Sequence, residues 1–143
     1  QGIDCGNIKL LMIGVFPHER EKMFYDLINS DKRIIFVGWQ SGENLKKYIC
    51  ASDLYVQPGS HSITMQTAMC CGLPVVVARD FYHSSFLKDN TGWYASTEQE
   101  LRTIFIEIIR NRSILNVKSR NSFNFAKYNL DVKYCCKKYL YKY

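Results

Sequence analysis

Five short, mostly apolar segments, each followed by a turn and a helical pattern, constrain the fold of this chain more than any other feature. Apolar runs of about four to eight residues between turn residues are typical of strands buried on both faces of a sheet. The predicted strands cover residues 8–15, 33–37, 53–57, 74–78 and 91–94. The predicted helices cover residues 18–29, 43–51, 62–71, 97–110, 113–128 and 131–143. This alternation predicts an α/β fold, a Rossmann-like parallel sheet with helices on both faces and a helical C-terminal tail.

Residues at the predicted helix ends support these boundaries. Pro17 suits the first turn of a helix, because its missing N–H needs no partner there. Gly72 suits the left-handed position just past a helix C-terminus. Thr97, with Glu100 three residues later, forms a capping-box pattern. The length of 143 residues fits one core, so we treat residues 1–143 as a single domain whose tail comprises residues 113–143.

The parallel sheet predicts where a ligand binds. Ligands of doubly wound sheets lie outside the carboxyl ends of the strands. Four loops should therefore lie near one another, at residues 14–18, 38–42, 58–64 and 79–83. Within them, His18 and His83 have no partner that the sequence identifies. Arg79 in the last loop, and Lys88 beyond it, are expected at the solvated surface.

The loop at 58–64 has the features of an anion site. A predicted strand leads through small polar residues directly into a helix, whose free N–H groups and dipole favour a negative charge. Gly59 allows close approach to the backbone, and a diphosphate is a natural ligand for such a loop. The loop and first helical turn consist of Gly59, Ser60, His61, Ser62, Ile63 and Thr64.

Four sequence motifs, in order and in register, resemble the retaining glycosyltransferase family 4 group of GT-B enzymes. Residues 68–76 read AMCCGLPVV and are similar to that group's EAMACGLPVV signature. Residues 51–58 (ASDLYVQP), 36–39 (FVGW) and 89–93 (DNTGW) resemble its other strand and loop motifs. The similarity runs from about residue 8 to residue 94, and it identifies the chain as the donor-binding half of such an enzyme.

The resemblance implies transfer of a hexose from a UDP- or GDP-linked sugar to a glycan or lipid-linked acceptor, with retention, without a metal and without a further cofactor. It implies a role in polysaccharide biosynthesis and an acceptor-binding half outside this chain, so that the chain alone is expected to be inactive. No catalytic residue is assigned. The expected donor-binding residues are Gly38, Trp39, Gly59, Ser60, His61, Ser62, Ile63, Thr64, Gln66 and Thr67.

The chain departs from the family pattern at two carboxylates. Thr67 and Gly59 stand where the family carries a pair of glutamates eight residues apart. Thr67 can offer a hydroxyl to a ribose and Gln66 an amide to a sugar. Two alternatives therefore stay open beside the transferase. One is a non-catalytic nucleotide- or phosphosugar-binding module, and the other is half of a sugar-nucleotide epimerase.

The net charge of +6 arises from the tail. From Lys118 onward there are seven Lys or Arg residues and one acidic residue, Asp131, interleaved with Phe and Tyr. This pattern predicts an interface with the other half of the enzyme or peripheral contact with an anionic membrane. Nucleic-acid binding ranks behind both, and no nucleic-acid partner is expected because no recognised motif accompanies the charge.

Six cysteines and the lack of a signal-type N-terminus predict a reducing compartment. The cysteines are Cys5, Cys50, Cys70, Cys71, Cys135 and Cys136. Without CxxC spacing or a nearby pair of histidines, neither zinc nor a disulfide framework is expected. No apolar run approaches the ~18 residues needed to cross a bilayer. We expect a cytoplasmic protein, with a peripheral position at the inner face of the membrane if the tail binds lipid.

Overall fold

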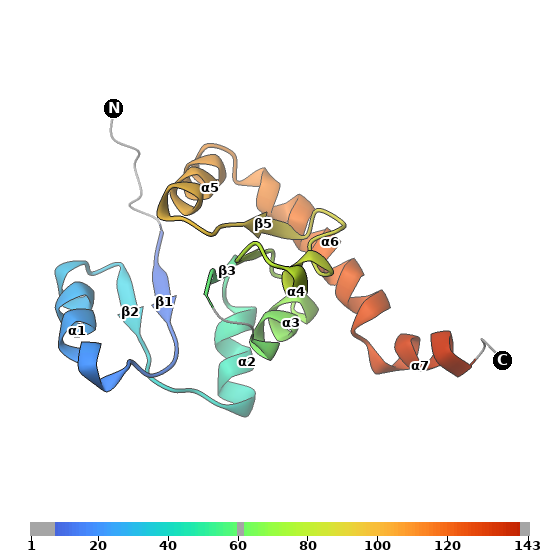
Figure 1. The fold of residues 1–143 in the computed structure, drawn as a ribbon, viewed down its shortest axis with the longest axis horizontal. Helices are drawn as coiled ribbons and strands as arrows, with labels where there is room; N and C mark the ends of the chain where they lie inside the picture. Colours follow the sequence, from blue (N-terminus) through green and yellow to red (C-terminus); the bar gives the residue numbers. More distant parts are fainter. Residues whose placement is uncertain (1–7, 60–61, 141–143) are drawn as a thin grey trace. The chain divides into compact units, whose positions relative to one another are not determined.

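The computed structural model describes residues 8–59 and 62–140, with side chains described up to residue 136 (Figure 1). The chain divides into two compact units, Gln1–Leu45 and Lys46–Tyr143. Each unit is described by itself, and a single domain over residues 1–143 stays a prediction.

The first unit is a parallel strand pair covered by one helix. It contains β1 (Leu10–Met12), η1 (His18–Arg20), α1 (Glu21–Ser30), β2 (Ile34–Phe36) and the start of α2 (Gly42–Cys50). Leu10 pairs with Ile34, and the strands run in the same direction. The ring of Phe16 stacks on Phe24 of α1 at 4.5 Å and on Phe36 of β2 at 4.4 Å, so aromatic packing holds the helix against the strand.

The second unit contains the larger sheet. Its strands are β3 (Tyr55–Gln57), β4 (Val75–Val77) and β5 (Gly92–Tyr94), all parallel and in the order β3-β4-β5. Its helices are α3 (Ile63–Cys70), α4 (Phe81–Ser84), α5 (Glu98–Arg110), α6 (Ser113–Asn129) and α7 (Val132–Leu140). The short helix α4 lies where the sequence predicted a loop.

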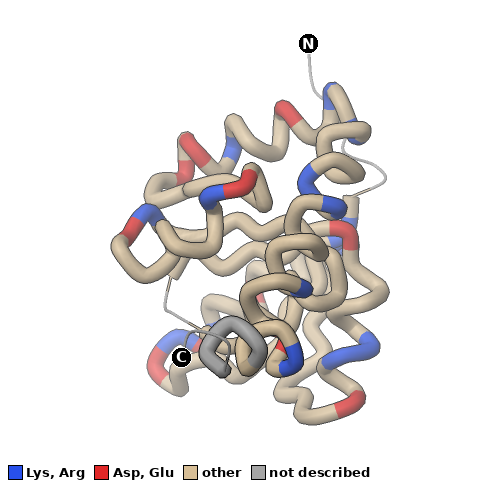
Figure 2. The backbone as a smooth tube through the Cα atoms, turned by 90° about the vertical axis from the view of Figure 1, so that its right-hand side faces the viewer, with Lys and Arg blue, Asp and Glu red and all other residues tan. Residues whose placement is uncertain are grey.

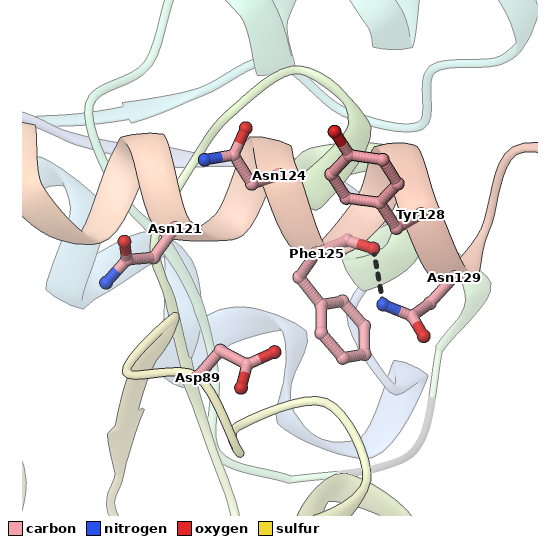
Figure 3. Close-up of a pocket in the computed structure, with 6 residues that line it drawn as sticks. All are labelled: Asp89, Asn121, Asn124, Phe125, Tyr128 and Asn129. Atoms are coloured by element: carbon pink, nitrogen blue, oxygen red, sulfur yellow. Dashed lines mark hydrogen bonds between the residues drawn. The ribbon is translucent and has the colours of Figure 1, made fainter.

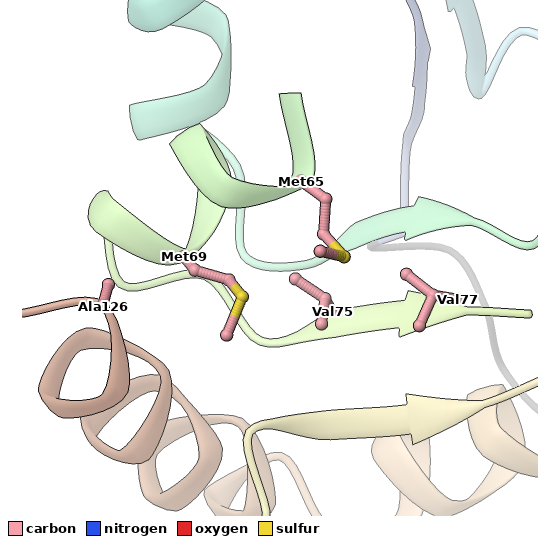
Figure 4. Packing of buried hydrophobic residues seen from close by; sticks show 5 residues of the cluster. All are labelled: Met65, Met69, Val75, Val77 and Ala126. Atoms are coloured by element: carbon pink, nitrogen blue, oxygen red, sulfur yellow. The ribbon is translucent and has the colours of Figure 1, made fainter. Parts of the chain in front are cut away.

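Alternate residues of β4 point to two different cores, which places helices on both faces of this sheet. Val75 and Val77 pack with Met65 and Met69 of α3 and with Ala126 of α6 (Figure 4). On the opposite face, Val76 packs with Ala95 and with Ile104 and Ile108 of α5. Figure 1 shows α3 and α5 on opposite sides of the β3-β4-β5 sheet. The predicted α/β class, with parallel strands and flanking helices, is confirmed.

The strand pairing differs from the prediction in one respect, because the five described strands form two groups instead of one sheet. In the doubly wound order 3-2-1-4-5-6, strands two and three pair with each other, and strands four, five and six form a second run. The strand pair β1-β2 corresponds to the first of these groups, and the three-stranded sheet β3-β4-β5 corresponds to the second.

Glycines at two positions satisfy geometric demands of the second unit. Gly72 has φ +79° and ends α3 with a Schellman motif, in which its N–H bonds to the Met69 carbonyl and the Leu73 N–H to the Ala68 carbonyl, both at 2.9 Å. Gly92 starts β5 so close to β4 that a Cβ atom would lie 1.9 Å from the Val75 carbonyl oxygen. The predicted role of Gly72 is confirmed.

Candidate functional site

The carboxyl end of β3 leads into the N-terminus of α3, as the sequence predicted. Ser62 is the N-cap, with extended backbone angles, and its Oγ accepts the Thr64 N–H at 3.1 Å. The Ser62 carbonyl accepts the Met65 N–H at 3.2 Å. Among the described residues, the Ile63 N–H has no hydrogen-bond partner. An uncapped N–H at the positive end of a helix dipole is suited to an anion.

The packing of α3 fixes this end of the helix in place. Met65, Ala68 and Met69 are at most 1 % exposed and anchor the helix to the sheet. Ile63, in contrast, is 77 % exposed, so the first turn faces solvent. Gly59 is exposed, with open space around the position of a Cβ atom. Ser60 and His61 lie outside the described residues, and their predicted contacts stay predictions.

Tyr55 belongs to this site although the sequence did not indicate it. It lies on β3, and its hydroxyl donates to Oε1 of Gln57. Burial raises the pKa of Tyr55, and the hydrogen bond with Ser62 opposes this rise. The phenol therefore stays protonated at neutral pH.

The two side chains expected at the ribose and sugar end are already engaged within the protein. The Gln66 amide donates to the Tyr82 hydroxyl at 3.1 Å and so links α3 to α4. The Thr67 hydroxyl points back to the Ile63 carbonyl at 3.5 Å, a long contact. Gly59 and Thr67 carry no carboxylate, and a sugar at Gln66 would share that amide with Tyr82.

The loop after β4 lies on the same sheet edge, because β3 and β4 are parallel neighbours. Arg79 is exposed there, its guanidinium carbon 4.8 Å from the centre of the Tyr94 ring and its backbone N–H bonded to Ser96 Oγ at 3.1 Å. The Arg79 guanidinium therefore places a positive charge at the carboxyl end of the strands, where it makes a cation–π contact with Tyr94. The carboxyl ends of β3 and β4, which lead into the loops 58–64 and 79–83, are therefore neighbours, as predicted.

Both histidines that the sequence left unpaired have partners. His83 is 1 % exposed, and its Nδ1 lies 2.8 Å from Asp80 Oδ2 and 3.1 Å from the Ala78 carbonyl oxygen. Asp80 also caps α4 by accepting the His83 N–H at 2.8 Å. His18 lies 3.5 Å from Glu21 on the first unit. The burial of His83 gives it a structural role in shaping the β4 loop.

Gly38 and Trp39 belong to the first unit. The Gly38 carbonyl accepts the Gly14 N–H at 3.0 Å, which brings the loops 14–18 and 38–42 together. Gly38 has φ +69°, and the Trp39 side chain is 67 % exposed. Their assignment to the same donor site as Ser62 stays a prediction.

Lys118, the first basic residue of the predicted basic stretch, is buried. It is 5 % exposed and donates to the Gly92 carbonyl at 2.8 Å and to the Asn90 side chain, with its Nζ 4.3 Å from the centre of the Trp93 ring. Burial lowers the pKa of Lys118. Arg120, Lys127 and Lys133 are exposed, whereas the side chains from residue 137 onward lie outside the described part. Figure 2 marks the positions of Lys and Arg along the backbone in blue.

A hollow of about 310 Å³ lies on α6, at the amino-terminal side of β5 (Figure 3). It contains none of the predicted donor residues. Its lining residues are Asp89, Asn121, Asn124, Phe125, Tyr128 and Asn129.

In the described part of the chain, no group of three or more His, Cys, Asp or Glu residues could hold a metal ion. Across the same residues, no helix has the length and apolar character to cross a membrane.

Comparisons with known proteins agree with this architecture. The family described as "Glycosyl transferases group 1" matches residues 2–111. The search of curated proteins found no match to the chain. The fold is similar to Alr3699/HepE from Anabaena, solved in complex with UDP, at 20 % identity and a TM-score of 0.76 over 93 % of this chain and 40 % of that one.

Two other solved structures share the fold. Sucrose-phosphate synthase (tll1590) from Thermosynechococcus elongatus is 19 % identical, with a TM-score of 0.74 over 94 % of this chain and 38 % of that one. WaaG, a glycosyltransferase involved in lipopolysaccharide biosynthesis, is 16 % identical, with a TM-score of 0.71 over 85 % of this chain and 34 % of that one. The chain spans two fifths or less of each of these structures.

Proposed function

Because the chain belongs to the glycosyl transferases group 1 family, we propose that it is the donor-binding part of an enzyme that transfers a hexose from a UDP- or GDP-linked sugar. In this proposal the nucleotide-sugar is a co-substrate, reaction occurs with retention, and no metal or further cofactor takes part. The acceptor is a glycan or a lipid-linked sugar of a polysaccharide pathway, held by a part of the enzyme outside this chain.

The observation that carries this proposal is the N-terminus of α3 at the carboxyl end of β3. The Ile63 N–H, at the positive end of the helix dipole, supplies a donor for a diphosphate oxygen. Ser62 sets the direction of the first turn by capping Thr64 at 3.1 Å. Binding of the diphosphate here would stabilise the leaving nucleotide as the bond to the sugar breaks.

Arg79 provides a second, independent contribution. Its side chain lies on the same edge of the sheet and is exposed, so it can approach a phosphate oxygen by rotation of its long side chain. The solved structure of Alr3699/HepE in complex with UDP, which shares this fold, supports a nucleotide ligand. We propose UDP as the first nucleotide to test.

The missing glutamate pair favours one alternative, a nucleotide- or phosphosugar-binding module without transfer activity. The hydroxyl of Thr67 and the amide of Gln66 are both occupied within the protein, and neither can supply a carboxylate. The two proposals share the diphosphate site and differ in whether a sugar is transferred. Product formation by the full enzyme that contains this chain would separate them.

Titration calorimetry of the 143-residue chain with UDP, UDP-glucose, GDP and GDP-mannose tests the shared site. We expect binding of at least one nucleotide in the micromolar to millimolar range. Ser62→Trp should abolish that binding, because the indole would fill the space in front of the Ile63 N–H. Ser113→Trp is the matched control, since Ser113 is an exposed serine at the first position of α6.

The control separates a site effect from a general effect of a surface tryptophan. Retained binding in Ser113→Trp and lost binding in Ser62→Trp support the site. Equal binding by both variants would place the nucleotide elsewhere, and no heat with any nucleotide at millimolar concentration would contradict the donor-binding proposal.

A further inference from the structure

Two cysteine side chains that the proposed reaction does not use lie in contact within the second unit. Cys50 is the last residue of α2, and Cys71 is the C-cap of α3, 21 positions later. Their sulfur atoms are 3.1 Å apart, closer than the ~3.5–4.0 Å that separates non-bonded carbon atoms. Both are free thiols.

The environment of the pair allows chemistry from solvent. Cys50 is exposed, and Cys71 is half-buried. Burial, together with the neighbouring Cys50 thiol, raises the pKa of Cys71 to about 11. Cys50 is therefore the thiol that reacts first with a reagent from solvent. Cys71 is the neighbouring thiol that can react next.

From this geometry we infer that Cys50 and Cys71 form a dithiol modification site that closes to a disulfide with a small-molecule disulfide as oxidant. The Cys50 thiolate attacks one sulfur of oxidised glutathione, the glutathione S–S bond breaks, and one glutathione leaves as thiolate. The deprotonated Cys71 sulfur then attacks the Cys50 sulfur and expels the second glutathione. The two glutathione thiolates take up the two protons that the cysteines released, so one disulfide is reduced as one is formed.

Because the two sulfur atoms are already in contact, disulfide formation requires little movement of the protein. A disulfide needs about 2.05 Å between the sulfurs, so the pair must approach by only about 1 Å. The neighbouring Cys70 is exposed and has no such contact among the described residues, although it adjoins Cys71 in sequence. The site is thus specific to one of the two adjacent cysteines at the end of α3.

The cross-link would enclose the segment that carries the candidate anion site. Between Cys50 and Cys71 lie β3, the loop that follows it and α3. A covalent closure around these residues restricts the unfolded chain, and we expect the melting temperature to rise by about 5–10 °C on oxidation. Disulfides of this kind in a reducing compartment are usually transient or redox-sensing.

The test counts thiols in the 143-residue chain. The protein is incubated with oxidised or reduced glutathione, unfolded and alkylated with N-ethylmaleimide. Its mass is then measured by mass spectrometry. The chain has six cysteines, so the reduced form should take six labels and the oxidised form four, six minus two. Peptide mapping without reductant should find Cys50 joined to Cys71.

Cysteine variants and a probe that is not an oxidant test whether Cys50 and Cys71 are the reacting pair. Cys50→Ser and Cys71→Ser should each prevent the cross-link, whereas Cys70→Ser should retain it. Phenylarsine oxide, which bridges paired thiols without oxidation, should protect two thiols from labelling in the parent chain and in Cys70→Ser alone. Six labels after oxidation, a cross-link to a different cysteine, or a glutathione adduct that persists on Cys50 would overturn the inference.

Discussion

Replacement of Gly92 by alanine tests the contact between β4 and β5 on which the second unit depends. The added methyl carbon would lie 1.9 Å from the Val75 carbonyl oxygen, 2.9 Å from its carbonyl carbon and 3.0 Å from its Cγ2. The closest of these is about 1.5 Å short of an ordinary contact. Because two of the three atoms belong to the backbone of β4, side-chain rotation cannot relieve the clash.

The cost follows from the shift that the strand must make. Overpacking typically costs about 1–3 kcal/mol, and moving β5 away also weakens hydrogen bonds such as that from the Ala95 N–H to the Val77 carbonyl, 2.9 Å long. At about 1 kcal/mol for each weakened bond, the total is about 3–5 kcal/mol. For a chain of this size that loss corresponds to a fall in melting temperature of about 10–15 °C.

Thermal and urea unfolding followed by circular dichroism measure this loss against two other glycines. Gly72→Ala should cost about 1 kcal/mol, because Gly72 has φ +79° but meets only ordinary contacts of 3.7 Å. Gly59→Ala should change stability by less than about 1 kcal/mol, because its Cβ would meet open space. If Gly92→Ala proved as stable as Gly59→Ala, the register of β4 with β5 would be wrong.

Three further predictions address the core, the buried lysine and the sheet edge. Met69→Ala should lower the free energy of unfolding by about 2–5 kcal/mol in urea, because Met69 is 0 % exposed; a loss under 1 kcal/mol would show that α3 is not packed on β4. Lys118→Met should cost about 1–3 kcal/mol, because the Gly92 carbonyl and the Asn90 side chain lose their donor. Since burial lowers the pKa of Lys118, the unfolded chain binds more protons, and the stability of the parent relative to Lys118→Met should rise as the pH approaches 10.5; a fall would contradict this burial. Arg79→Ala should weaken UDP binding about three- to tenfold in calorimetry, and unchanged affinity would remove Arg79 from the site.

The local parts of this fold could be predicted because they depend on local chemistry. The strand and helix order, the αL turn at Gly72 and the N-cap at Thr97 follow from residues within a few positions of one another. The N-cap at Ser62 follows in the same way, because a serine before a helical pattern offers its hydroxyl to a free N–H. The position of the candidate anion site was therefore available from the sequence.

Features that depend on contacts between residues far apart in the sequence could not be predicted from the sequence. A lysine in an amphipathic tail is ordinarily solvated, and only the approach of the residue 90–92 turn to α6 explains why Lys118 is buried. The partnership of Tyr55 with Ser62 and the contact of Cys50 with Cys71 likewise join different elements. The two strand groups required knowledge of which strands pair, which apolar runs alone do not encode.

The central claim, that the N-terminus of α3 binds the diphosphate of a nucleotide-sugar, is tested most directly by following backbone amides during a titration. In a ¹⁵N-labelled chain titrated with UDP, the largest shift changes should occur at Ile63 and at its neighbours Ser62 and Thr64, because the ligand would bind at the Ile63 N–H. Uridine, which lacks the diphosphate, should leave these amides unchanged. Shifts confined to the α6 hollow around Asn124 and Tyr128, or equal shifts with uridine and UDP, would contradict the claim.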